Sequence, residues 1–265
     1  MGKKAVFFDV DGTLIDCVNG MNYVLDSTKE AINKIKRNGD LAVLATGRPK
    51  SFLYDEITKL DFDAYITSNG AYVELDGKAI YNRTIDKETI DKVISMCQVE
   101  NMDYVFEGQE LSYFSDFNSK NIKQLVSAFS IQKRCLTDKA ESKDISANKM
   151  VLIFDNERQK EISFELLKDQ FTFMRHPGEN SYDIYFKDCT KADGIKRLID
   201  YLNIKLEDTF AFGDGINDIE MLQTVGCGIA MGNANEKLKK VANLVTDDVF
   251  SHGIYNALIS LQLIA

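Results

Sequence analysis

Short apolar runs alternate with amphipathic stretches over the first part of the chain. Ala5–Phe8 and Leu41–Ala45 are apolar throughout, and Ala64–Thr67 forms a third run. Runs of this length are typical of strands that are buried on both faces of a sheet. Between the first two runs, residues 27–30 (Ser-Thr-Lys-Glu) fit a capping box that opens a helix. The alternation predicts parallel strands joined by helices.

Two local signals add further elements. Pro49 follows the second apolar run and suits the first turn of a helix, which we expect to extend to about residue 60. Asp76 and Gly77 separate two short strand-like runs. Because both central residues of a type I′ turn need a positive φ, this pair predicts a β-hairpin.

The pattern changes near residue 83, where strand pairs mixed with helices begin, and the strand–helix rhythm returns near residue 190. The order predicts a doubly wound, Rossmann-like parallel α/β sheet made by residues 1–82 and 188–265. An α+β domain, residues 83–187, is inserted into it. The insert is expected to contain strands at residues 104–106, 111–114, 149–154, 171–174 and 181–186, and helices near residues 86–97, 120–129 and 159–168.

Two aspartates, Asp9 and Asp11, follow the first apolar run directly. Open α/β sheets bind their ligands at the carboxyl ends of the strands. Two carboxylates this close repel each other unless a cation or a shared proton relieves them. Mg²⁺ suits the position, because it takes oxygen ligands and keeps open positions for phosphate oxygens. The same Asp-x-Asp-Gly pattern is also common in simple turns, so it does not decide the matter alone.

Further polar groups follow other predicted strands or begin a predicted helix. They are Thr46 and Gly47 after the second run, Lys191 at the start of a helix, and Asp214, Asn217 and Asp218 after the apolar run at residues 209–212. Because the carboxyl ends of parallel strands meet at one edge, we expect these groups to converge on one crevice. Carboxylates that cage Mg²⁺ beside a lysine, a hydroxyl and a backbone amide suit phosphoryl transfer.

Composition narrows the class of partner. The chain has 265 residues, 45% of them apolar, and a formal net charge of −9, which is typical of a folded globular protein. The negative charge and the lack of a basic stripe argue against nucleic acid as a ligand. No apolar stretch approaches the roughly 18 residues of a membrane span. Five widely spread cysteines without metal-ligand spacing predict reduced thiols in a cytoplasmic protein.

The polar motifs, taken in order, resemble the four signature motifs of the haloacid dehalogenase superfamily of phosphatases. These motifs are residues 9–13 (Asp-Val-Asp-Gly-Thr), residues 46–48 (Thr-Gly-Arg), Lys191, and residues 213–218 (Gly-Asp-Gly-Ile-Asn-Asp). The insert resembles the type IIB cap of that superfamily, and residues 68–71 (Ser-Asn-Gly-Ala) resemble a stretch of its Cof-type subfamily. One departure is that Ala192 follows Lys191, where the family often has glycine.

This resemblance implies a role for each motif residue. Asp9 would be the nucleophile that forms an aspartyl-phosphate, and Asp11 would protonate the leaving alcohol and later activate water. Mg²⁺ would be held by Asp9, the backbone carbonyl of Asp11 and Asp214, with Asp218 close by, directly or through water. The transferring phosphoryl group would contact Thr46, Gly47, Lys191 and Asn217. Arg48 would contact substrate or cap, or have a structural role, and the sequence does not choose between these.

The resemblance also implies that the insert closes over the site and sets specificity. Candidates are Glu107, Arg175, His176, Asn180 and Tyr182, although a solvated surface position is the simpler expectation for each. His176 is expected to belong to a turn with Pro177 and Gly178.

The predicted function is a Mg²⁺-dependent phosphoric monoester hydrolase acting on small phosphorylated metabolites such as sugar phosphates, as a monomer or homodimer. A phosphomutase of the same superfamily and a non-catalytic phospho-ligand sensor are the alternatives. The intact motif residues speak against the sensor, and the physiological substrate stays open.

Overall fold

The computed structural model describes residues 2–128, 135–176 and 180–265. The chain divides into two compact units. The first comprises Met1–Gly47, Asp55–Tyr81 and Thr190–Ala265, and the second comprises Arg48–Tyr54 and Asn82–Cys189. Residues 48–54, which the sequence placed with the core, thus group with the insert. Among the helices of the described residues, none is long and apolar enough to cross a membrane.

The first unit contains, in the described residues, a sheet of eight strands in the order β14-β13-β12-β1-β2-β3-β4-β5. Pairing is parallel from β14 to β3 and antiparallel between β3 and β4. The strands are β1 Ala5–Phe8, β2 Leu41–Ala45, β3 Ala64–Thr67, β4 Tyr72–Leu75, β5 Lys78–Asn82, β12 Thr209–Gly213, β13 Cys227–Ala230 and β14 Leu244–Val245. This confirms the predicted parallel α/β sheet. Asp76 and Gly77 both have a positive φ, as the predicted hairpin requires.

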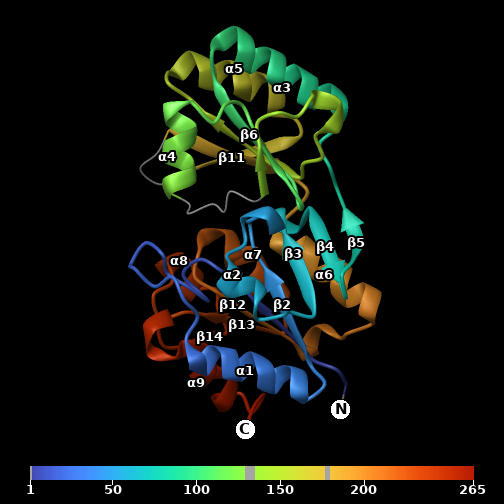
Figure 1. Cartoon of the computed structure of the whole chain (residues 1–265). Helices are drawn as coiled ribbons and strands as arrows, with labels where there is room; N and C mark the ends of the chain where they lie inside the picture. The colour runs from blue at the N-terminus through green and yellow to red at the C-terminus, as the bar shows by residue number, and fades with distance from the viewer. Residues whose placement is uncertain (1, 129–134, 177–179) are drawn as a thin grey trace. The chain divides into compact units, whose positions relative to one another are not determined.

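Helices join these strands. They are α1 Asp26–Arg37, α2 Asp55–Thr58, α6 Lys191–Leu202, α7 Ile219–Thr224, α8 Glu236–Lys239 and α9 Gly253–Ser260. Helices α1 and α9 lie side by side (Figure 1). The capping box predicted at residues 27–30 is wrong, because α1 begins at Asp26 and the Ser27 hydroxyl instead bonds to Nδ1 of His252 at 2.7 Å.

The helix predicted from Pro49 to residue 60 is also wrong. A 3-10 helix, Lys50–Phe52, and the short α2 take its place. The buried Phe52 ring belongs to the hydrophobic core of the second unit, and Ser51 donates a hydrogen bond to the carbonyl of Gly108 at 2.7 Å. These contacts outweigh local helix preference, which is a weak determinant of structure by comparison.

The second unit contains a sheet of six strands within the described residues, in the order β10-β11-β9-β6-β7-β8. All pairs are antiparallel except β7 with β8. The strands are β6 Asp103–Glu107, β7 Ser112–Phe114, β8 Leu136–Thr137, β9 Lys149–Ile153, β10 Phe171–Arg175 and β11 Ser181–Phe186. Its helices are α3 Lys87–Glu100, α4 Lys120–Ala128 and α5 Glu157–Leu167, of which α3 and α5 lie side by side (Figure 1). The predicted helix end at Phe129 lies outside the described residues.

A buried cluster of charges joins three strands of this second sheet. Glu107 on β6 lies opposite Lys149 on β9, with 3.2 Å between Glu107 Oε2 and Lys149 Nζ. Lys149 Nζ also lies 2.8 Å from Asp183 Oδ1 on β11, and His176 Nε2 lies 3.2 Å from the same oxygen. Burial raises the pKa of Glu107 to about 7, although Lys149 opposes the shift. For Asp183 burial is outweighed by Lys149 and His176, which hold its pKa below its usual range.

The core of the first unit is centred on aromatic rings of neighbouring strands. Phe8 of β1 and Phe212 of β12 are fully buried and stacked, with their ring centroids 5.4 Å apart. Phe8 also contacts Phe62, at a centroid distance of 6.0 Å. Because these two strands end at the candidate site, their packing fixes its base.

We expect Phe212→Ala to lower the free energy of unfolding of the first unit by about 3–5 kcal/mol, because it leaves a cavity against Phe8. Phe250→Ala is the matched control, since that side chain is 47% exposed and its loss should cost below about 1 kcal/mol. Urea denaturation followed by circular dichroism measures both, as the chain has no tryptophan. Equal losses in the two variants would contradict the assignment of Phe212 to the core.

A second prediction concerns Glu107. Its pKa is about 7 in the folded chain against 4.5 ordinarily, so its contribution to stability is present below pH 4.5 and is lost as the pH rises through 7. Glu107→Gln removes this loss, and its stability relative to wild type should rise by about 3 kcal/mol between these pH values. Urea titrations at several pH values measure it. Glu110→Gln is the control, because Glu110 is exposed in the loop that follows β6. Parallel pH profiles for wild type and Glu107→Gln would contradict the prediction.

Candidate active site

The register of the first sheet brings three strand ends together. Phe8 of β1 pairs with Leu44 of β2 on one side and with Phe212 of β12 on the other. Asp9 continues the β1 ladder by donating its backbone N–H to the carbonyl of Phe212 at 3.1 Å. The residues that follow these three strands therefore lie at one edge of the sheet, as predicted for parallel strands.

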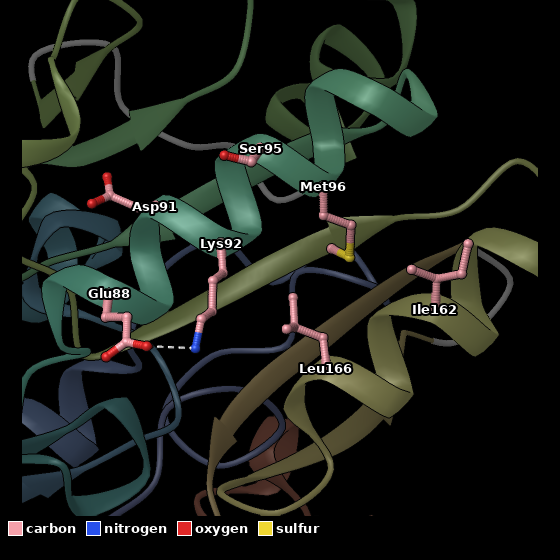
Figure 2. Close-up of a pocket in the computed structure, with 7 residues that line it drawn as sticks. All are labelled: Glu88, Asp91, Lys92, Ser95, Met96, Ile162 and Leu166. Carbon is pink, nitrogen blue, oxygen red and sulfur yellow. Dashed lines mark ion pairs between the residues drawn. The ribbon is translucent and has the colours of Figure 1, made fainter.

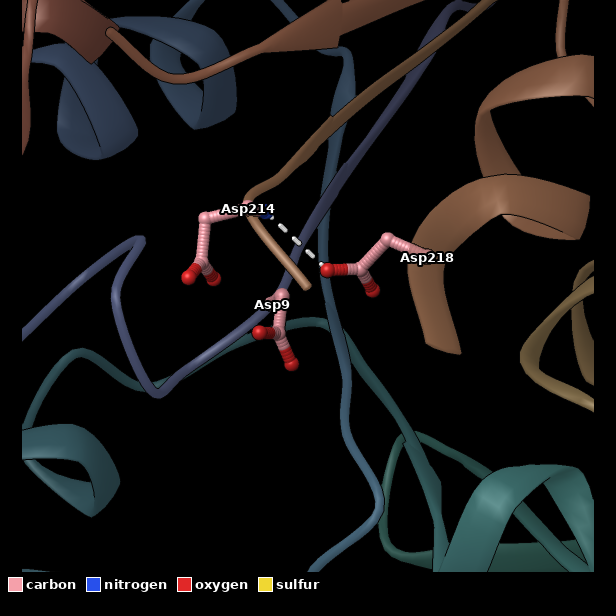
Figure 3. Close-up of side chains that lie close together, drawn as sticks. All are labelled: Asp9, Asp214 and Asp218. Atoms are coloured by element: carbon pink, nitrogen blue, oxygen red, sulfur yellow. Dashed lines mark hydrogen bonds between the residues drawn. The ribbon is translucent and has the colours of Figure 1, made fainter. Parts of the chain in front are cut away.

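Three carboxylates converge at this edge (Figure 3). One oxygen atom from each of Asp9, Asp214 and Asp218 lies within 4.8 Å of the other two. Asp9 and Asp218 are buried and Asp214 is half-buried. Three carboxylates at this separation strongly favour a bound cation or a retained proton.

Lys191 supplies one positive charge to the group. It is the first residue of α6, whose start is fixed by a capping box between Thr190 and Asp193. Its Nζ donates to Asp9 Oδ1 at 2.6 Å and to Asp218 Oδ1 at 2.7 Å, and the side chain is 1% exposed. Although burial alone would lower it, the two carboxylates raise the pKa of Lys191, so this residue is charged.

One lysine does not neutralise three carboxylates. Burial, and then the charge of Asp218, raises the pKa of Asp9 well above its ordinary value. Burial, followed by the charge of Asp218, also raises the pKa of Asp214 to about 7. The donor set consists of oxygen atoms only, which is the set that a hard divalent cation prefers. Asp9, Asp214 and Asp218 therefore fit a divalent metal ion.

Asp218 uses both of its oxygen atoms within the protein. Oδ1 accepts from Lys191, and Oδ2 accepts the backbone N–H groups of Asp214 at 3.0 Å and Gly215 at 2.9 Å. The bond to the Asp214 amide is the dashed line in Figure 3. Asp218 thus shapes the loop that presents Asp214, in addition to its place in the carboxylate group.

The residues predicted to contact the phosphoryl group also lie at this edge of the sheet. Thr46 follows β2 and is buried, with its N–H bonded to the carbonyl of Ile66 at 2.8 Å. Gly47 follows it, and Asn217 lies exposed on the 3-10 helix Ile216–Asp218. Asp11 is exposed and does not belong to the group of three carboxylates.

The residues of the insert that were predicted to set substrate specificity differ in their burial and in their contacts. Glu107 and His176 belong to the buried charge cluster, so the surface position expected for Glu107 is wrong. Tyr182 packs on Phe154, with ring centroids 5.2 Å apart. Arg175 and Asn180 are exposed. The turn predicted at Pro177 and Gly178 lies outside the described residues.

Arg48 groups with the second unit. Its guanidinium lies over the Tyr54 ring, 4.6 Å from the centroid, and NH2 donates to the Tyr54 hydroxyl at 2.9 Å. These contacts support a structural role for Arg48 within residues 48–54.

Two structural contributors were not identified from the sequence. The Thr13 hydroxyl donates to Asp214 Oδ1 at 3.3 Å, and its place within the first motif was the available signal. The buried turn Ser68–Gly70 has a positive φ at each residue. Asn69 N–H bonds to the Thr46 carbonyl at 3.2 Å, and a Cβ on Gly70 would lie 2.1 Å from the carbonyl oxygen of Thr190. This turn therefore connects the Thr46 loop to the start of α6.

The second unit also has a hollow of about 650 Å³ between α3 and α5 (Figure 2). It is lined by Glu88, Asp91, Lys92, Ser95, Met96, Ile162 and Leu166. Glu88 and Lys92 form an ion pair at 2.7 Å, and none of the predicted site residues belongs to this lining. The candidate active site is therefore the carboxylate group of the first unit.

Known proteins are similar to this chain over most of its length. The family model for haloacid dehalogenase-like hydrolases matches residues 6–258. The phosphatase YwpJ of Bacillus subtilis (strain 168) is 27% identical, over 95% of this chain and 97% of its own. A crystal structure of a hypothetical protein from Geobacillus kaustophilus HTA426 is 32% identical with a TM-score of 0.90, over 99% of this chain and 100% of its own.

A further solved structure is described as that of BT4131, a sugar phosphatase of HAD subclass IIB. It is 28% identical with a TM-score of 0.80, over 99% of this chain and 100% of its own. The motif order, the inserted second unit and these similarities have one explanation. The chain belongs to the haloacid dehalogenase superfamily, as a Cof-type phosphatase with a cap of subclass IIB.

Proposed function

We propose that this phosphatase hydrolyses small phosphomonoesters, such as sugar phosphates or related metabolites, with Mg²⁺ and through an aspartyl-phosphate. The observation that carries the proposal is the position of Lys191 Nζ, between Asp9 Oδ1 at 2.6 Å and Asp218 Oδ1 at 2.7 Å. A buried lysine that holds one oxygen of a carboxylate orients that carboxylate for nucleophilic attack.

Asp9 is the proposed nucleophile. Because Oδ1 is bonded to Lys191, Oδ2 is the oxygen that attacks phosphorus while the ester oxygen leaves. Asp11 gives its proton to that leaving oxygen, which departs as an alcohol. Asp11 then takes a proton from water as the water attacks phosphorus, which breaks the bond to Asp9 and releases phosphate.

The other motif residues bind and orient the phosphoryl group. The Thr46 hydroxyl, the Gly47 amide, Lys191 and the Asn217 amide are the proposed donors to its oxygen atoms. Asp9, the Asp11 carbonyl and Asp214 would hold Mg²⁺, with Asp218 interacting through water, since both Asp218 oxygens already accept hydrogen bonds. When bound, Mg²⁺ neutralises negative charge on the carboxylates and the phosphoryl oxygens.

Residues 83–187 are the proposed cap domain, which supplies specificity to the core formed by residues 1–82 and 188–265. The description of BT4131 as a sugar phosphatase supports a polyhydroxylated substrate. The net charge of −9 argues against nucleic acid as a partner. None of the five cysteines forms a disulfide within the described residues, which is compatible with the reducing conditions of the proposed cytoplasmic location. The proposed form is a monomer or homodimer.

We expect Asp9→Asn to lower kcat for phosphomonoesters by at least about a thousandfold, because the amide is not a nucleophile. Asp26→Asn is the matched control, since the Asp26 side chain is 99% exposed on α1 and should leave kcat unchanged. Release of inorganic phosphate from a panel of sugar phosphates, nucleotides, pyridoxal phosphate and p-nitrophenyl phosphate measures both. Full activity in Asp9→Asn would refute the assignment of Asp9 as the nucleophile.

Removal of divalent cations with EDTA should abolish phosphate release, and Mg²⁺ should restore it, because the carboxylates otherwise repel the substrate phosphate. Asp214→Asn should raise the Mg²⁺ concentration for half-maximal activity by about tenfold or more, which corresponds to a loss of about 1.4 kcal/mol in cation affinity. Undiminished turnover in EDTA would contradict the metal requirement. Transfer of phosphate to a second sugar hydroxyl would favour the phosphomutase instead.

A further inference from the structure

The turn after β1 is packed directly against Asp214. Gly12 has a φ of +81°, and a Cβ at this position would lie 2.1 Å from Asp214 Oδ2. Thr13 donates its hydroxyl to Asp214 Oδ1 at 3.3 Å. The backbone of residues 11–13 and the Asp214 carboxylate therefore occupy adjoining space, and a small shift of one would displace the other.

Asp11 stands on this turn, and its side chain is exposed. The backbone around it is held locally, as the Gly12 N–H donates to the carbonyl of Ile15 at 2.7 Å. A general acid has to lie within hydrogen-bond reach of the leaving oxygen, and a shift of about 1 Å is costly for catalysis. The path of the backbone at residues 11–13 therefore contributes to the position of the Asp11 carboxyl group.

Asn233 bonds to this turn from a segment 221 residues away in the chain. It lies between β13 and α8, and its Nδ2 donates to the carbonyl oxygen of Gly12 at 2.7 Å. Its Oδ1 accepts the backbone N–H of Val249 at 2.9 Å. Since a backbone N–H can only donate, Oδ1 must face Val249, and Nδ2 must therefore face Gly12. The orientation of the amide is thus fixed by its two partners.

The same segment also holds the loop that carries Asp214. Met231 N–H donates to the carbonyl of Gly213 at 3.0 Å, and Asn235 N–H donates to the carbonyl of Asp214 at 2.9 Å. Residues 231–235 thus bond to both sides of the Gly12–Asp214 contact, and the Asn233 side chain makes the bond on the Gly12 side. Asn233 is exposed, so ordering its side chain carries an entropic cost that the two hydrogen bonds must exceed.

We propose that Asn233 is a positioning residue, which holds the Gly12 carbonyl so that Asp11 is placed to protonate the leaving alcohol. This inference rests on the proposed phosphatase mechanism, in which Asp11 is the general acid. Asn233 does not touch the reacting atoms; it acts through the backbone of residues 11–13.

If Asn233 positions Asp11, its loss should impair the cleavage of some esters more than others, depending on the leaving group. An alkyl phosphate needs a proton on its leaving oxygen, whereas p-nitrophenyl phosphate releases a stable phenolate without one. A displaced general acid therefore lowers kcat/KM for the alkyl ester much more than for the aryl ester. A general loss of folded protein, or of the metal site, would lower both equally.

The test uses the full chain at saturating Mg²⁺. The kcat/KM is measured for p-nitrophenyl phosphate and for the hexose or pentose phosphate that wild type cleaves fastest. In Asn233→Ala the ratio of alkyl to aryl kcat/KM should fall by about tenfold or more, which is the usual loss when a hydrogen bond that orients a functional group is removed. Asn233→Asp keeps an acceptor for Val249 but loses the donor to Gly12, so it should show the same fall.

Asn235→Ala is the matched control. The Asn235 side chain accepts from the N–H of Lys237 at the start of α8, and its own backbone bond to Asp214 survives the substitution. The ratio should stay within about twofold of wild type. An unchanged ratio in both Asn233 variants, or an equal fall in Asn235→Ala, would overturn the role of Asn233.

Asp9→Asn in the same assay separates this inference from the proposed function. If Asp9→Asn keeps its activity, the phosphatase mechanism fails and the Asn233 role fails with it. If Asp9→Asn is inactive while the ratio of alkyl to aryl kcat/KM in the Asn233 variants equals that of wild type, only the role of Asn233 is refuted.

Discussion

The site depends on one interaction, the placement of the Lys191 ammonium between two buried carboxylates. Lys191 is 1% exposed and donates to Asp9 and Asp218 at 2.6 and 2.7 Å. Burying such charges is costly unless they are paired and fully hydrogen-bonded, and removing one partner leaves an uncompensated charge. The first turn of α6 therefore has to be fixed against the ends of β1 and β12. Its capping box and its contact with the buried turn Ser68–Gly70 provide this.

Hydrogen bonds and close packing between the loops that follow the strands hold the other residues of the candidate site in place. Asp218 binds the amides of Asp214 and Gly215, the turn at Gly12 fills the space beside Asp214, and residues 231–235 bond to both loops. Each contact joins segments that are far apart in the sequence and adjacent in the sheet. Phosphoryl transfer relies mainly on positioning and charge neutralisation, so a site assembled from rigid strand ends is suited to it.

Periodicity was enough to predict the parallel sheet, which is confirmed. Strand-end chemistry predicted that polar groups meet at one edge of this sheet, and Asp9, Asp214 and Asp218 do lie close together there. The sheet and this convergence follow from buried apolar runs and from the geometry of parallel strands, which are local signals. The bounds of the insert and the roles of the site residues stay predictions. The helix after Pro49 was not predictable, because Phe52 and Ser51 take part in the second unit. The burial of Glu107 depends on its pairing with Lys149 across the sheet. The bond from Asn233 to Gly12 spans 221 residues and has no local signal at all.

In the proposed mechanism Asp9 becomes phosphorylated during turnover. The most direct measurement is to quench the enzyme during turnover of a good phosphomonoester and to treat it with borohydride, which reduces an acyl phosphate to an alcohol. Peptide mass spectrometry then locates the change. We expect conversion of the Asp9 carboxyl group alone, and only when substrate is present. Turnover without any modified carboxylate, or with modification at Asp11 or Asp214 instead of Asp9, would contradict it.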